Sequence, residues 1–248
     1  MTAEPGTRTA DAHEPGRFLG WFRRPGLRMF AVGVNDGIVG TAGVLQGFAG
    51  ADATPQTMFI ASVAALVAGA VAGGGSQYVE LAAQRDAEQA IVRAEQAELA
   101  ADPADAAEDV EAALEASGVP DALASAVAER LTAHDPIGSQ LAIEHGIPDP
   151  LPWHAPVLGA LAHAFAIALG GALPLAVLLL YPAAWESWAL FVAVLVSVAV
   201  VSALIALSAG TNPWRALLRM VLVGVITMVA AFFAGELAAV LDDTLRPA

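Results

Sequence analysis

A single aspartate lies inside an apolar stretch that is long enough to cross a membrane. The stretch covers residues 29–50, and Asp36 is its only charged residue. An ionisable carboxylate in hydrocarbon is costly, so such residues usually line a polar path or meet a cation. Asp36 is therefore predicted to meet a cation within the membrane. The alternative is that Asp36 reaches the lipid headgroups, because it lies only seven residues after the start of the stretch.

A row of carboxylates follows the second apolar stretch. At about 100° per residue, these side chains fall within an arc of roughly 80° on one helix face: Glu80, Glu88, Glu95, Glu98 and Asp102. Like charges at this spacing repel one another and weaken the helix, and a bound divalent cation would relieve the repulsion. Oxygen ligands suit Mg, Ca and Mn, and they also accommodate Fe(II). A solvated acidic face remains the alternative.

Histidines near other polar residues give further candidates. His134, Glu144 and His145 lie close together in sequence, and imidazole with carboxylate can bind Fe, Mn or Zn. Surface histidines are the alternative here. His163 lies within the third apolar stretch, where it is either a proton relay or ligand, or a neutral side chain that is hydrogen-bonded within the bundle.

The composition is that of a membrane protein. Hydrophobic residues make up 57% of the 248 residues, mean hydropathy is +0.62, and 15% of residues are charged, against roughly 25% in soluble domains. Without cysteine, neither disulfides nor thiolate ligands are available. Most of the net charge of −14 comes from residues 85–149, which hold 15 acidic residues and three arginines. This excess disfavours nucleic acid as a partner and favours cations.

The fold class predicted is an all-α membrane protein with five transmembrane helices and a helical cytoplasmic insert between spans 2 and 3. Each span reaches the ~20 residues that cross the hydrocarbon core, and the five spans are residues 29–50, 56–81, 156–180, 188–208 and 216–241. A signal peptide is an alternative for the first stretch, but the stretch starts late and is long for one.

Arginine positions predict the orientation. Arginines precede span 1, follow span 2 and lie between spans 4 and 5, whereas the two alternate loops carry none. Because positive residues stay on the cytoplasmic side, the N-terminus and the acidic insert are predicted to be cytoplasmic and the C-terminus outside. The corresponding regions are a disordered, basic-flanked tail (1–28), spans 1 and 2 (29–82), the acidic helical metal-binding domain (83–152), and spans 3 to 5 with a short outer tail (153–248).

Helix-breaking residues divide the insert. The helix of span 2 is expected to continue to about Ala101, because no breaker precedes Pro103. Asp105 and Asp121 are expected to cap the next two helices, and Pro136 to open a short fourth one.

Several strings together resemble the vacuolar iron transporter family over residues 30–241. They are Asn35-Asp36-Gly37-Ile38-Val39 in the first span, Ala83-Gln84-Arg85-Asp86-Ala87-Glu88-Gln89-Ala90 after the second, Glu144-His145-Gly146-Ile147 at the end of the insert, and Leu169-Gly170-Gly171-Ala172-Leu173-Pro174-Leu175 in the third span. The resemblance implies a homodimer with a pore between the two copies of the first span. It also implies that Asp36 passes the ion and that cytoplasmic glutamates collect it, in exchange for protons.

The chain departs from the family pattern at the end of span 2. The family usually has Met-Ala-Ala-Gly-Glu-Tyr there, and this chain has Gly73-Gly74-Gly75-Ser76-Gln77-Tyr78. Gly73 and Gln77 would thus line the pathway without a thioether or a carboxylate. Likewise, methionines often found shortly before the last glutamate of the insert correspond to Gln140 and Leu141. Loss of thioethers should weaken the preference for Fe(II) over Mn(II).

The function predicted is export of Fe(II) or Mn(II) from the cytoplasm by proton antiport. Asp36 would be the ligand in the membrane, and Glu88, Glu95, Glu98 and Glu144 the capture site, with Glu80 and Asp102 as weaker members. The chain is expected to be no enzyme, to need no cofactor beyond the transported ion, and to lie in a bacterial plasma membrane. The alternative is a membrane metal sensor, buffer or scaffold that does not transport. An oxidative enzyme is disfavoured because the chain has no Glu-x-x-His pair of the di-iron type.

Overall fold

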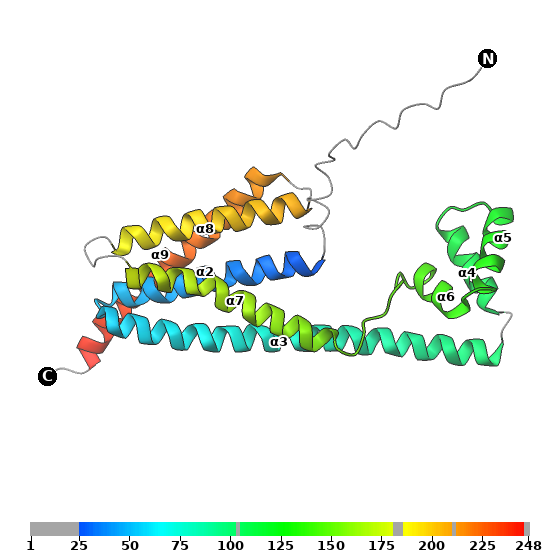
Figure 1. Ribbon diagram of the computed structural model, residues 1–248, viewed down its shortest axis with the longest axis horizontal. Helices are drawn as coiled ribbons and strands as arrows, with labels where there is room; N and C mark the ends of the chain where they lie inside the picture. Colours follow the sequence, from blue (N-terminus) through cyan, green and yellow to red (C-terminus); the bar gives the residue numbers. More distant parts are fainter. Residues whose placement is uncertain (1–24, 103–104, 181–185, 210–211, 246–248) are drawn as a thin grey trace, which may run out of the picture. The chain divides into compact units, whose positions relative to one another are not determined.

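The computed structural model describes residues 25–102, 105–180, 186–209 and 212–245, and the regular secondary structure within them is all helical (Figure 1). The helices that the described residues form are α2 (Pro25–Gly50), α3 (Pro55–Ala101), α4 (Asp105–Ala116), α5 (Asp121–Thr132), α6 (Pro136–Ile143), α7 (Ala155–Leu180), α8 (Glu186–Ala209) and α9 (Pro213–Leu245). The all-α prediction is confirmed for these residues. Residues 1–24 of the predicted tail, with most of the arginines before the first span, lie outside them, and residues 25–28 form the start of α2.

The chain divides into two compact units. One comprises Met1–Gly74 with Ala162–Ala248 and is called the apolar bundle below; the other, Gly75–Leu161, is called the acidic unit. Helix α3 runs through both units without interruption for 47 residues, which is about 70 Å at 1.5 Å per residue. The prediction that the helix of span 2 continues to Ala101 is confirmed.

Helices α2, α8 and α9 pack against one another in the apolar bundle (Figure 1). Apolar side chains spaced along α2 supply one side of the core, as Ile38, Ala42 and Leu45 do, and all three are fully buried. Val194 and Val198 of α8 lie in the same cluster. The apolar stretches from which the membrane spans were predicted thus also supply the contacts between these helices.

Glycines bring α2 close to two other helices. A Cβ atom on Gly37 would overlap the carbonyl of Ile167 in α7, and one on Gly170 would overlap the carbonyl of Val34. In the same way, Gly235 of α9 lies against the backbone of Gly47. Small residues are what allows membrane helices to approach this closely. The glycine-rich strings of spans 1 and 3 therefore form the crossing that positions Asp36.

Three helical segments among the described residues are long and apolar enough to cross a membrane. They are α3, α7 and residues Leu217–Leu245 of α9. Helices α2 and α8, with 26 and 24 residues, coincide in extent with the first and fourth predicted spans. The five-span topology and the cytoplasmic side of the acidic unit stay predictions.

In the acidic unit, α4, α5 and α6 pack together around buried Val110, Ala124, Ala128 and Leu141. Pro136 opens α6 as predicted, and the carboxylate of Asp135 caps it by accepting a hydrogen bond from the backbone N–H of Gly138 at 2.9 Å. The predicted cap at Asp121 is wrong. Pro120, with extended backbone, is the N-cap of α5, and Asp121 is the first helical residue. At that position the negative charge of Asp121 still interacts favourably with the positive end of the helix dipole.

Candidate metal sites

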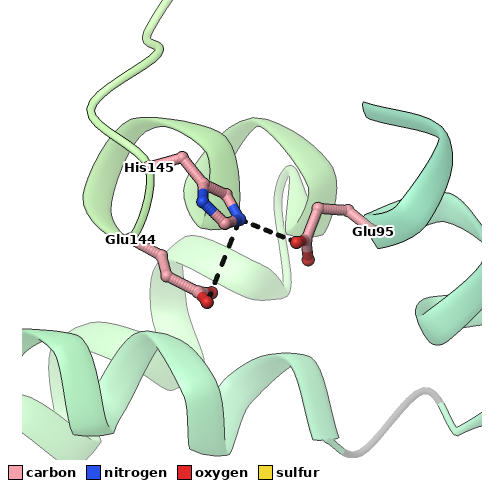
Figure 2. A network of polar contacts seen from close by, with 3 residues as sticks. All are labelled: Glu95, Glu144 and His145. Carbon is pink, nitrogen blue, oxygen red and sulfur yellow. Dashed lines mark hydrogen bonds and ion pairs between the residues drawn. The ribbon is translucent and has the colours of Figure 1, made fainter. Parts of the chain in front are cut away.

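The acidic unit brings two carboxylates to one imidazole ring. Glu95 Oε1 lies 2.7 Å from His145 Nε2, and Glu144 Oε1 lies 3.9 Å from the same nitrogen. Figure 2 shows both carboxylates directed toward the ring. One ligand atom from each residue falls within 4.8 Å of the other two. These three residues are called the Glu95 cluster below.

Helix ends and a turn position the Glu95 cluster. Glu95 lies in the extended part of α3 and is only 6% exposed. Glu144 is the C-cap of α6, and His145 follows it. Gly146 then takes a φ of +66°, which glycine adopts without strain, and the chain turns toward α7. Glu88 holds this returning segment, because its Oε2 accepts a hydrogen bond from the backbone N–H of Leu151 at 2.7 Å.

The electrostatics of the Glu95 cluster favour a bound cation. Burial raises the pKa of the Glu144 carboxyl above its ordinary value of 4.5, and His145 opposes this shift. The neighbouring carboxylates of Glu95, Asp109 and Glu98 raise the pKa further. Negative charge is thus crowded at this position, and a divalent cation would relieve it more strongly than a single proton.

The spacing suits a small divalent ion. In octahedral coordination with ligands about 2.1 Å from the metal, adjacent ligands lie about 3 Å apart and opposite ones about 4.2 Å apart. The 2.7 and 3.9 Å separations are each within about 0.3 Å of these two octahedral values, so small side-chain rotations would reach them. Mixed imidazole and carboxylate donors suit first-row metals such as Fe(II) and Mn(II) better than Ca.

The remaining predicted ligands of this region lie outside the Glu95 cluster. Glu88 is two turns earlier on α3 and bonds to Leu151 N and to Gln84 Nε2. Glu80, Glu98 and Asp102 are exposed, although Glu98 lies near enough to act on the Glu144 carboxyl. His134 is exposed after α5 and does not join the cluster.

Two residues that were not predicted as ligands lie close to this site in sequence or in space. Asp109 of α4 acts electrostatically on Glu144. Gln140 is fully buried one helical turn before Glu144, and neither of its amide atoms has a hydrogen-bond partner among the described residues. The sequence marked Gln140 only as a departure from the family. A glutamine within a short helix that is otherwise mostly apolar is the sequence signal that could have indicated it.

A second acidic group lies where α4 meets α5. Ligand atoms of Glu111, Glu115 and Asp121 fall within 4.8 Å of one another. A hydrogen bond with Asp121 is the largest cause of a raised pKa at Glu115, and the charge of Glu111 adds to it. The group is mostly exposed and carries no imidazole. An ordinary acidic surface accounts for it.

In the apolar bundle, Asp36 lines a hollow of about 180 Å³. Residues of α2, α3 and α7 form its wall, namely Asp36, Gly37, Gly40, Thr41, Val44, Ala65, Leu66, Gly69 and Ile167. Asp36 itself is exposed on the described chain, whereas its neighbour Asn35 is buried. Asp36 and Thr41 are the polar side chains of a lining that is otherwise glycine and apolar residues, and a cation path beside Asp36 stays a prediction.

The predicted pathway residues of α3 differ in their surroundings. Gly73 lies beside α7, where a Cβ atom would overlap the tip of Ile167 and come within 3.6–3.8 Å of the His163 ring. Gln77, one turn later, is 6% exposed, and its Nε2 has no hydrogen-bond partner within the described part of the chain.

Long apolar helices that cross through glycines define an integral membrane protein. The sequence profile of the VIT family matches residues 27–236, so the chain belongs to that family. A vacuolar iron transporter from Acanthamoeba castellanii is 29% identical over 217 residues, which cover 87% of this chain and 80% of the relative. The resemblance seen in the sequence strings is thereby confirmed.

Proposed function

We propose that the protein transports a divalent metal ion, Fe(II) or Mn(II), out of the cytoplasm in exchange for protons. The observation that carries the proposal is the position of Asp36, which lines a hollow within the apolar bundle. A protein that only binds the metal ion would need only the Glu95 cluster, whereas a carboxylate inside the membrane helps the ion to cross it. Membership of a transporter family and the name of the Acanthamoeba relative support transport over catalysis.

Capture and passage are assigned to different residues. The Glu95 cluster receives the ion, Glu88 holds the segment that carries two of the ligands, and Glu98 adds negative charge nearby. Glu80 and Asp102 extend the acidic surface of the same helix. Asp36, with Gly73 and Gln77, belongs to the pathway.

The direction of transport rests on the orientation of the chain. Arg28 precedes span 1, Arg85 and Arg93 follow span 2, and Arg215 and Arg219 lie between spans 4 and 5. By the preference of positive residues for the cytoplasmic side, the acidic unit meets the cytoplasmic ion first. Export follows from this placement, and a plasma membrane is its proposed site.

The exposure of Asp36 supports a homodimer. On the described chain, this carboxylate and the neighbouring Gly40 are both exposed on α2. A carboxylate that faced lipid here would carry a cost of several kcal/mol. A second copy of α2 across the hollow would cover it and close a pore between the two chains.

A metal sensor or buffer is the second candidate, favoured by Gly73 and Gln77, which carry neither a thioether nor a carboxylate. Uptake of Fe(II) and Mn(II) into proteoliposomes that contain the purified chain separates the two functions. Transport predicts metal accumulation that rises with an imposed pH gradient and is absent from empty liposomes. A sensor predicts no accumulation, while the detergent-purified protein still binds metal.

A further inference from the structure

The segment that leads into α7 packs along one face of α3. Glu88 Oε2 accepts a hydrogen bond from the backbone N–H of Leu151, and a Cβ atom on Gly159 would overlap the side chain of Leu81. These four residues all belong to the acidic unit. The two contacts show that the two segments run antiparallel. Arg85 lies between Leu81 and Glu88 on the same face of α3, so it is level with the first residues of α7.

The positive charge of Arg85 is not balanced at this position. Its Nε is buried without a hydrogen-bond partner, and the residue makes no ion pair within the described part of the chain. The carboxylate of Glu88, one turn later, is engaged elsewhere, because its oxygens accept hydrogen bonds from Leu151 N and Gln84 Nε2. The first turn of α7 contains no acidic residue and brings the positive end of the helix dipole. An anion is therefore the partner that Arg85 lacks.

Arg85 lies at the depth of the lipid headgroups. Helices α3 and α7 are both long and apolar enough to cross a membrane, and the span predicted on α3 ends at Leu81. Four further residues of helix add about 6 Å, which stays within the headgroup layer of about 5–8 Å on each side of the hydrocarbon core. Trp153, two residues before α7, is 77% exposed. Tryptophan is enriched at this depth, so the two side chains mark the same membrane surface.

We propose that Arg85 binds the phosphate group of a phospholipid and that Trp153 packs against the same lipid. A guanidinium group donates charge-assisted hydrogen bonds to phosphate, and its planar fork matches two phosphate oxygens. Val157 and Leu158, in the first turn of α7, are exposed beside this position. Their apolar side chains suit an occupant with acyl chains better than a soluble anion. Lipid binding at Arg85 goes beyond the proposed transport and does not depend on whether an ion passes Asp36.

Native mass spectrometry of the detergent-purified full chain measures lipid binding directly. The probes are dioleoyl phosphatidylglycerol and dioleoylglycerol, which has the same acyl chains and no phosphate. The wild type is expected to bind phosphatidylglycerol more tightly than dioleoylglycerol. Arg85→Gln is expected to weaken phosphatidylglycerol binding by at least about tenfold, as loss of a hydrogen bond to a charged group does, and to leave dioleoylglycerol binding unchanged. Arg93→Gln removes the same charge from an exposed position further along α3 and should bind both lipids as the wild type does.

Several outcomes would overturn the lipid site. Equal binding of the two lipids by the wild type contradicts a role for the phosphate, and equal losses in Arg85→Gln and Arg93→Gln contradict a role for Arg85. Inorganic phosphate is added as a competitor, and displacement of phosphatidylglycerol at equal concentration would mean a site for a soluble anion instead.

A second variant separates loss of the lipid from loss of the fold. Trp153→Ala changes an exposed side chain, so its unfolding temperature in lipid-free detergent should equal that of the wild type. Its binding of phosphatidylglycerol is expected to fall several-fold, because the apolar contact beside Arg85 is lost. Wild-type binding in Trp153→Ala overturns the proposal even if Arg85→Gln does not fold.

Discussion

Glu95 in the acidic unit and Asp36 in the apolar bundle are both carboxylates on long helices, but different features position them. Glu95 is buried against His145, a residue 50 positions further along the chain. Asp36 is exposed beside a hollow whose walls are largely glycine and small apolar side chains. The first site depends on side-chain partners, and the second depends on how closely backbones approach.

This difference suits two tasks. A cluster of several charges binds an ion tightly, because each ligand adds to the attraction and mutual repulsion is relieved on binding. A pathway must release the ion again, and few charges with open space allow this. We therefore expect substitutions in the Glu95 cluster to alter metal affinity, and substitutions around Asp36 to alter metal flux and dimer assembly.

A cysteine scan of α2 tests whether the open face of Asp36 is covered by a second chain. The wild-type chain has no cysteine, so Gly40→Cys provides a single thiol on the exposed face, where nothing lies within 4 Å of an added Cβ atom. Mild oxidation in membranes is expected to convert most of the protein to a crosslinked dimer. Leu222→Cys on α9, 57% exposed, is the control and should remain monomeric. Equal crosslinking at both positions would contradict the dimer.

Substitution of Glu95 tests whether capture depends on the cluster or on acidic charge in general. Glu95→Gln is expected to lower Mn(II) affinity by about 10–100-fold, as loss of a metal-site partner does. Glu98→Gln removes the same charge from an exposed position one turn away and should have a much smaller effect. Calorimetric titration of the detergent-purified protein measures both. Equal losses would mean a diffuse acidic surface.

The glycine crossing is tested by adding one methyl group. Gly37→Ala places a Cβ atom against the carbonyl of Ile167, so α2 and α7 must separate. Overpacking of this kind costs about 1–3 kcal/mol, and each kcal/mol lowers the melting temperature by about 2–4 °C for a chain of this size. Gly75→Ala, at an exposed position of α3 with no atom within 4 Å of an added Cβ atom, is the matched control. Thermal unfolding in detergent should separate the two variants.

The pH dependence of metal binding gives the smallest predicted effect. The folded-state pKa of Glu144 is raised above 4.5. At pH values just above 4.5 the metal-free folded protein therefore keeps a proton on Glu144, and a binding metal ion must displace that proton. Mn(II) affinity should therefore rise with pH through this window, and the contribution of this carboxyl to apo stability should fall. Glu144→Gln should flatten the dependence. A pH profile identical to that of the wild type would exclude Glu144 as the titrating group.

Much of the helical architecture follows from local sequence. Apolar runs and the absence of a breaker before Pro103 predict α3 through to Ala101, and Pro136 marks the start of α6. The cap at Asp121 was predicted wrongly because Pro120, already in extended backbone, takes the flanking position. Local signals thus determine which segments are helical, with errors of about one residue at their ends.

The candidate site was predictable only in part. The row of carboxylates on α3 was evident from helical spacing, but which of them is buried depends on where the segment after α6 returns. Two hydrogen bonds fix the position of that segment: one joins Glu88 to Leu151, 63 residues later, and the other joins Glu95 to His145, 50 residues later. A local sequence pattern does not encode contacts between residues so far apart in the chain. Asp109 was missed for the same reason. Asp36 was predictable because charge in an apolar stretch is itself the signal.

The most direct test of the division between capture and passage is a paired measurement on Asp36→Asn. Mn(II) binding to the detergent-purified variant and Mn(II) uptake into proteoliposomes are compared with those of the wild type, with Asp86→Asn, an exposed residue of α3, as the control. For Asp36→Asn we expect the wild-type Mn(II) affinity, because the Glu95 cluster is intact, together with loss of nearly all Mn(II) uptake. Uptake that continues at the wild-type rate would contradict the role of Asp36 and with it the proposed path through the membrane.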